Sequence, residues 1–275
     1  MNLGSTFGTD APVIGMIHLP ALPGAPGAPD DGAVAMDAAV ERAVDDARTL
    51  EAGGVDGLMI ENFGDAPFYP DDVPKHTVAA TTRAATAVAG AVDLPIGINV
   101  LRNDAEAAVS VAAAVGAAFV RVNVHTGARV TDQGIVEGRA HETVRLRERL
   151  GVDVGILADT DVKHSAPLAP AGYSAESFAD TAERGLADAV IASGSGTGHA
   201  VDDDALEAVV AERERHGLDT PVFVGSGVRP DTVGDLLGVA DGVIVGTALK
   251  ENGETTAPVD VDRVAELVAR ADEAR

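Results

Sequence analysis

Short apolar runs alternate with longer stretches rich in Ala, Glu and Arg along the whole chain. Apolar runs rich in β-branched residues are typical of strands buried on both faces of a parallel sheet. Such runs predict strands at Val13–His18, Asp56–Glu61, Pro95–Val100, Phe119–Val124, Asp153–Ala158, Asp188–Ala192, Pro221–Gly225 and Gly242–Gly246. Helical spacing of apolar positions predicts helices between them, including Ala35–Ala52, Thr77–Val92, Asp104–Val115 and Asp202–His216.

Strands that alternate with helices throughout a chain indicate an α/β fold with a parallel sheet. The length of 275 residues is close to the roughly 250 residues of a (β/α)8 barrel. We therefore expect one TIM-barrel domain, a (β/α)8 barrel spanning residues 1–275. A doubly wound open sheet is the alternative, but the number of strand–helix units favours a closed barrel.

The loops differ in length according to the direction of the connection. Helix-to-strand connections are short, as at Gly53-Gly54 and Gly116-Ala117, whereas several strand-to-helix connections are long. The long ones are Leu19–Asp31, Asn62–Lys75, His125–Arg139 and Thr160–Ala175. This asymmetry is typical of a barrel whose functional face is formed by the loops after the strands.

The last two predicted strands both end in small residues, in the runs VFVGSGV and GVIVGTALK. Small residues let backbone N–H groups approach a ligand closely, because no large side chain intervenes. Two adjacent strands that end this way are typical of the phosphate site after strands 7 and 8 of a barrel. The predicted phosphate-binding residues are Gly225, Ser226, Gly227, Gly246, Thr247 and Lys250. Two tight turns without a ligand are the alternative interpretation.

Polar residues at the ends of the other strands predict the rest of the site, because barrel enzymes keep their chemistry there. Glu61 and Asp159 are candidates for general acid–base catalysis, and Lys163 is a third catalytic candidate. The candidates for substrate binding are His18, Asn62, Asn99, Asn123, His125 and Ser193. For each of these residues a purely structural role is the alternative.

The sequence contains few candidate cofactor sites. Asp159 and Asp161 could together bind Mg²⁺ beside a substrate phosphate, and Lys163 could form a Schiff base in an apolar pocket. No spacing of His and carboxylates marks a zinc site. The glycine-rich run Gly194–Gly198 lacks the two-residue gap of a dinucleotide fingerprint.

The charge is strongly negative: 44 acidic residues face 20 basic ones, for a net charge of −24. The acidic residues are spread along the whole chain, which disfavours binding to nucleic acid or anionic membranes. Such a surface suits very high salt, where a short Debye length screens the repulsion. With no cysteine, no signal peptide and no apolar run of ~18 residues, we expect a protein without a membrane-spanning segment, in a high-salt cytoplasm. A homo-oligomer is compatible with the sequence.

Several motifs resemble those of the BtpA family. They are VIGMIHLPALPGAPGAP at Val13–Pro29, DGLMIENFGDAPF at Asp56–Phe68, PIGINVLRND at Pro95–Asp104, FVRVNVHTG at Phe119–Gly127 and ADTDVKHSAPL at Ala158–Leu168, together with GSGV and ADGVIVGTALK. The resemblance covers nearly the whole chain, and with the acidic surface it suggests a haloarchaeal-type member. It implies a phosphate-binding (β/α)8 barrel of the ribulose-phosphate-binding type, whose motif residues line one site.

The resemblance implies several activities. Bacterial relatives are described as nucleosidases or sugar-metabolism proteins, and the cyanobacterial namesake is linked to photosystem I biogenesis. We expect an enzyme acting on a phosphorylated sugar or nucleoside-type ligand at the anomeric carbon of a ribosyl unit. The alternatives are a non-catalytic biogenesis factor and a sugar-phosphate isomerase or aldolase.

Overall fold

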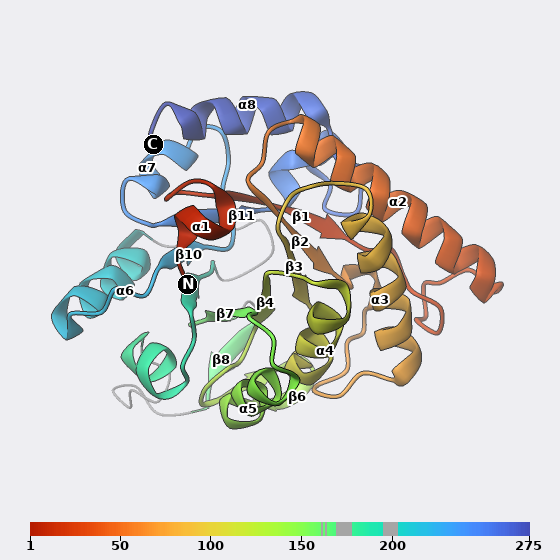
Figure 1. Cartoon of the computed structure of the whole chain (residues 1–275), viewed down its shortest axis with the longest axis horizontal. Helices are drawn as coiled ribbons and strands as arrows, with labels where there is room; N and C mark the ends of the chain where they lie inside the picture. The colour runs from red at the N-terminus through yellow and green to blue at the C-terminus, as the bar shows by residue number, and fades with distance from the viewer. Residues whose placement is uncertain (161, 163, 169–177, 195–202) are drawn as a thin grey trace.

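The barrel is closed by the pairing of its first strand with its last. The computed structural model describes residues 1–160, 162, 164–168, 178–194 and 203–275 (Figure 1). The barrel strands follow one another around the ring in the order β1-β11-β10-β9-β7-β4-β3-β2. They are β1 (Val13–His18), β2 (Gly57–Glu61), β3 (Ile96–Asn99), β4 (Phe119–Val122), β7 (Gly155–Asp159), β9 (Ala189–Ala192), β10 (Val222–Val224) and β11 (Gly242–Val245). The predicted (β/α)8 barrel is confirmed.

Helices pack around the outside of the ring (Figure 1). They are α2 (Gly32–Ala52), α3 (Lys75–Ala89), α4 (Ala105–Val115), α5 (Ala140–Leu150), α6 (Asp203–His216), α7 (Val233–Leu237) and α8 (Val261–Asp272), with a π-helical turn at Asp180–Arg184. Alanines at helical spacing let α2 lie close to the sheet, and Ala39, Ala43 and Ala47 are fully buried. No helix in the described part of the chain is both long and apolar enough to cross a bilayer.

Large side chains fill the end of the barrel where the strands begin. Phe119 and Phe223 are fully buried there, and glycines on neighbouring strands make room for their rings. A Cβ atom at Gly97 would lie 2.1 Å from the Phe119 ring. The short helix α1 (Leu3–Phe7) covers this end, with the Phe7 ring edge-on to Phe119 at 5.5 Å. This end of the barrel is therefore filled with apolar side chains, and open space lies at the other end.

Three aspartates fix the starts of neighbouring strands. Each precedes one strand and accepts a 2.8 Å hydrogen bond from a backbone N–H at the start of the next strand in the ring. The pairs are Asp56 with Val13, Asp188 with Ile156, and Asp241 with Val222. The same carboxylates pair with Arg275, Arg147 and Arg213. These aspartates thus accept hydrogen bonds from backbone N–H groups at strand starts that would otherwise lack an acceptor.

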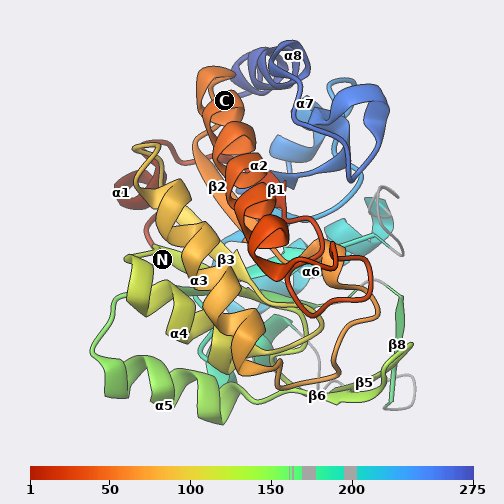
Figure 2. The ribbon, with the colours of Figure 1, turned by 90° about the vertical axis from the view of Figure 1, so that its right-hand side faces the viewer.

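A small sheet lies apart from the barrel and was not predicted. It consists of β5 (Ala128–Thr131), β6 (Gly134–Glu137) and β8 (Ser165–Pro167), in the order β6-β5-β8. These strands fall within the predicted long loops after β4 and β7. Figure 2 shows this sheet and α1 toward opposite ends of the molecule. The small sheet therefore lies on the side of the barrel where the strands end.

Candidate functional site

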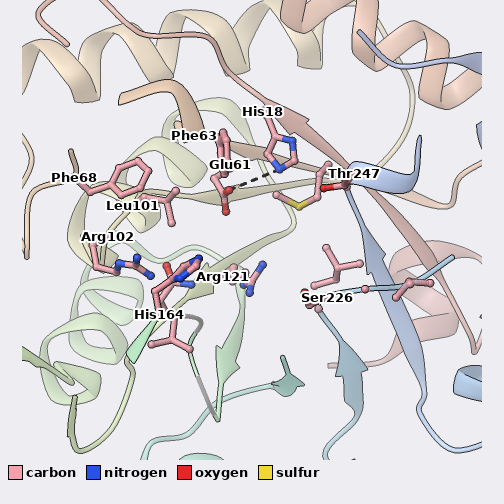
Figure 3. Close-up of a pocket in the computed structure, with 18 of the residues that line it drawn as sticks. His18, Glu61, Phe63, Phe68, Leu101, Arg102, Arg121, His164, Ser226 and Thr247 are labelled. Carbon is pink, nitrogen blue, oxygen red and sulfur yellow. Dashed lines mark ion pairs between the residues drawn. The ribbon is translucent and has the colours of Figure 1, made fainter. Parts of the chain in front are cut away.

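A cavity of about 540 Å³ opens at the carboxyl ends of the barrel strands. Its wall comes from β1, β2, β4 and β11 and from the loops after β2, β3, β4, β7, β10 and β11. Figure 3 shows Glu61 and Arg121 between two sides of this cavity. On one side lie Phe68, Leu101 and Arg102, and on the other lie Ser226 and Thr247.

Backbone N–H groups form the side of the cavity after β10 and β11. Gly225 already donates its N–H to the Ala192 carbonyl at 2.8 Å, so this donor is used within the barrel. The N–H groups of Gly227, Val228, Thr247 and Ala248 have no acceptor among the described residues, and all four residues line the cavity. Gly227 has a φ of 68°, a left-handed conformation that favours glycine. This wall can therefore donate several hydrogen bonds to an anion.

A buried ion pair forms the floor between the two sides. Asp159 accepts hydrogen bonds from Nε and Nη2 of Arg121 at 3.0 and 2.8 Å, and from Asn123 and Ser193 at 2.8 and 2.9 Å. Burial by itself would lower the pKa of Arg121, but the nearby charges of Asp159 and Glu61 raise it above its usual value. Arg121 is therefore cationic.

Arg121 also lines the cavity, whereas Asp159 does not. Nη1 of Arg121 bonds to none of the described residues, yet it is not among the side-chain atoms sealed from solvent. This nitrogen is the part of the guanidinium available to a ligand. Asp159 orients Arg121 and neutralises its charge from below.

His18 and Glu61 form a second pair across the ends of β1 and β2. His18 Nε2 lies 3.8 Å from Glu61 Oε1, and both side chains are almost fully buried (Figure 3). His18 Nδ1 lies 3.2 Å from the carbonyl oxygen of Thr255, which can only accept, so Nδ1 carries a proton. Nε2 is thereby turned toward Glu61, at a distance longer than a hydrogen bond. Both side chains line the cavity, where each can exchange a proton with a ligand.

Four of the predicted substrate-binding residues do not line this cavity: Asn62, Asn99, His125 and Ser193. Asn62 holds a loop together: it accepts from the Leu101 N–H at 2.7 Å and donates to Asp65 at 3.1 Å. Asn99 lies below the cavity and donates to the Arg121 carbonyl at 2.9 Å.

His125 lines a separate hollow of about 920 Å³ and bonds through Nε2 to the Gly185 carbonyl at 2.8 Å. Burial lowers the pKa of His125, so its imidazole is neutral.

Lys250 was predicted to bind phosphate, but it points away from the cavity. Its side chain is fully buried against α2, where Nζ donates to Asp46 at 3.0 Å. Asp46 also accepts from the backbone N–H of Val259 and pairs with Arg42. Lys250 therefore ties the segment after β11 to α2.

The predicted Mg²⁺ site depends on Asp159 and Asp161. Both oxygens of Asp159 already accept hydrogen bonds, including two from the Arg121 guanidinium, and the magnesium site stays a prediction. Asp161 and the catalytic candidate Lys163 lie outside the described residues. Among the residues that are described, no group of three or more His, Asp or Glu side chains could hold a metal ion.

The remaining predicted residues converge on one place. His18, Glu61 and Asn123 line the cavity together with Gly225, Ser226, Gly227, Gly246 and Thr247. Ser193 is connected to the cavity only indirectly: it donates to Asp159, which in turn holds Arg121. The sequence interpretation missed Arg121, although the run FVRV contains a sign of it: a charged residue within an otherwise apolar, buried strand.

Comparison with known proteins identifies the family. The model of the BtpA family matches residues 9–273. The chain belongs to the BtpA family. It is 45% identical over 268 residues to the photosystem I biogenesis protein BtpA of Synechocystis, covering 98% of this chain and 90% of that one. It is 47% identical over 264 residues to an uncharacterized protein of Thermococcus kodakarensis, covering 96% of both chains.

Solved structures with the same barrel are more distant in sequence. Phosphoribosyl anthranilate isomerase from Thermus thermophilus aligns with a TM-score of 0.56 at 14% identity, covering 96% of this chain and all of that one. Tryptophan synthase from Mycobacterium tuberculosis aligns with a TM-score of 0.61 at 20% identity, covering 98% and 97%. At these identities the likeness shows that the BtpA-family chain shares their fold.

The buried position of Lys250 predicts a structural role. Lys250→Met leaves Asp46 buried without its cation, so we expect a loss of about 3–5 kcal/mol in the free energy of unfolding, measured by denaturant titration. Lys75→Met makes the same change at the exposed start of α3 and should alter stability little. A stable Lys250→Met protein with weakened phosphate binding would contradict this role.

Asp159→Asn should strongly destabilise the protein. The substitution leaves the Arg121 guanidinium buried without its counter-charge. We expect a loss of about 3–5 kcal/mol in the free energy of unfolding. Asp231→Asn is the matched control, because its ion pair with Arg229 is exposed. Equal stability of the two variants would refute the interpretation.

Proposed function

We propose that this BtpA-family protein is an enzyme that acts on a phosphorylated sugar or nucleoside-type substrate at the anomeric carbon of a ribosyl unit. The observation that carries the proposal is the shared cavity. Backbone donors after β10 and β11 line the same hollow as the His18–Glu61 pair and the cationic Arg121. An anion held by the donors would leave the attached sugar facing Glu61.

Each group has a separate part in the proposed reaction. The N–H groups of Gly227, Val228, Thr247 and Ala248 hold the phosphate. The bond between the anomeric carbon and its leaving group breaks, and the electron pair departs with the leaving group. Glu61 donates the proton that the leaving group takes up, or as a carboxylate stabilises the positive charge on the sugar. Water then attacks the anomeric carbon and loses a proton to the Glu61 carboxylate or to His18 Nε2, or phosphate attacks through an anionic oxygen, which has no proton to lose.

Arg121 and Asp159 have different roles in the proposed site. Arg121 presents Nη1 to a substrate hydroxyl or an incoming anion, and Asp159 fixes the orientation of its guanidinium. The proposal therefore gives the acid–base role to Glu61 and makes Asp159 a positioning residue. The names of the solved barrels support this substrate class, because phosphoribosyl anthranilate isomerase is named for a phosphoribosyl compound.

A second candidate function comes from the Synechocystis relative, which is a photosystem I biogenesis protein. Under this alternative the cavity binds its ligand as a sensor, and the protein assists assembly without converting anything. The two candidates differ in one observable. An enzyme consumes the ligand that stabilises it, whereas a sensor leaves that ligand unchanged.

The proposal is tested first by a screen for thermal stabilisation in molar KCl, using sugar phosphates, nucleosides and nucleotides. A ligand that binds only the folded state raises the melting temperature. Each stabilising ligand is then incubated with the protein, and the products are identified by NMR. An intact anomeric bond in the product would favour a sugar-phosphate isomerase or aldolase instead.

Glu61→Gln should lower kcat by about 10²–10⁴-fold, because the amide can neither donate nor accept the required proton. Binding of the stabilising ligand should persist, since the backbone donors are unchanged. Glu106→Gln provides the matched control at an exposed position on α4. Unaltered turnover in Glu61→Gln would remove Glu61 from this role.

A further inference from the structure

The aromatic residues are distributed unevenly between the core and the cavity. The chain has six phenylalanines and no tryptophan. Four of the phenylalanines are core residues at most 7% exposed, namely Phe7, Phe119, Phe178 and Phe223. The other two, Phe63 and Phe68, are half-buried, and both line the cavity. Aromatic surface left partly open within a cavity is suited to covering by a ligand.

Neighbouring side chains hold both rings in place. The Phe63 ring lies 4.9 Å from the His18 ring, at an interplanar angle of 47°. The guanidinium carbon of Arg102 lies 5.9 Å from the centre of the Phe68 ring. Arg102 is itself buried and donates to Gln133 at 3.0 Å and to Asp132 at 3.4 Å. This part of the wall is therefore organised before a ligand arrives.

Leu101 lies beside Phe68 and Arg102 in the same wall (Figure 3). We call the set Phe63, Phe68, Leu101 and Arg102 the aromatic wall. Its members follow β2 and β3, and β3 lies across the ring of strands from β10. The backbone donors follow β10 and β11. In Figure 3, Phe68, Leu101 and Arg102 lie across the cavity from Ser226 and Thr247, with Glu61 and Arg121 between them. Phe63 lies beside Glu61 and His18.

We propose that the aromatic wall binds a planar aromatic or heteroaromatic ring carried by the substrate, on the side of the reacting carbon away from the phosphate. This inference rests on the proposed function for the direction in which the substrate lies. Flat apolar surfaces and a guanidinium plane favour stacking with a ring over a hydrated sugar. Asp132 also lines the cavity there and can accept a hydrogen bond from a ring N–H group. The ring is the leaving group.

The test separates the ring from the phosphate with a matched set of ligands. The set contains ribose, ribose 5-phosphate, and adenosine, guanosine, cytidine and uridine, each with and without a 5′-phosphate. Dissociation constants are measured by calorimetry in molar KCl. We expect at least one base to tighten binding tenfold or more over the ribose compound with the same phosphate content. A set in which no base tightens binding would overturn the proposal.

Substitutions then locate the ring. The double variant Phe63→Leu and Phe68→Leu keeps apolar volume but removes both flat faces, and it should reduce the tenfold preference to less than threefold. Tyr69→Leu is the matched control, because Tyr69 is the exposed neighbour of Phe68 and does not line the cavity. Both proteins are checked for cooperative unfolding. A preference retained in the double variant, or lost equally in the control, would refute the aromatic wall.

The same data keep the two proposals distinguishable. If ribose 5-phosphate binds better than ribose but no base adds affinity, the aromatic wall fails and the phosphate site stands. If a base adds affinity that depends on Phe63 and Phe68 while phosphate adds none, the aromatic wall stands and the proposed phosphate site fails. If no ligand in the set binds, both proposals fail.

Discussion

The Arg121–Asp159 ion pair is the interaction on which the interior of the barrel depends. Both side chains are almost completely buried, and taking two charges out of water is costly unless their hydrogen-bonding groups are satisfied. Asn123 and Ser193 supply the additional donors to Asp159, and Asn99 binds the backbone of Arg121. The network joins β3, β4 and β7 with the residue after β9. Its geometry leaves one nitrogen of Arg121 directed at the cavity.

This network lies where the filling of the barrel changes from apolar to polar. Toward the starts of the strands, rings such as Phe119 occupy the space left by glycines such as Gly97, and no room remains for a ligand. Toward the ends of the strands, the inward-facing positions carry charged and amide side chains instead. The cavity has polar groups at its floor because of this change, and a ligand or water in the open space can supply the hydrogen bonds that buried polar groups need.

The sequence predicted the strands of the barrel because each one is a short, mostly apolar run that alternates with helical stretches, which is typical of strands buried on both faces. The strands β5, β6 and β8 escaped prediction because they are short and partly exposed, so no apolar pattern distinguishes them from loops. Strand ends likewise gave His18, Glu61, Asn123 and the glycine turns. Chain position alone could not say which way a side chain points. Asn62 and Lys250 follow strands as expected, but they bind Asp65 and Asp46 instead of lining the cavity.

Arg121 lines the cavity although it was not predicted to, because a residue inside a strand is normally assigned to the core. Its positive charge matters for the electrostatics of the proposed site. A net charge of −24 repels any anion at long range, whereas Arg121, Arg102 and the backbone donors attract an anion once it is inside the cavity. At molar salt the Debye length is only about 3 Å, so the long-range repulsion is screened while direct contacts inside the cavity are screened much less. An acidic surface and an anion site are therefore compatible in salt, and the short-range donors alone would decide the affinity of a phosphorylated ligand.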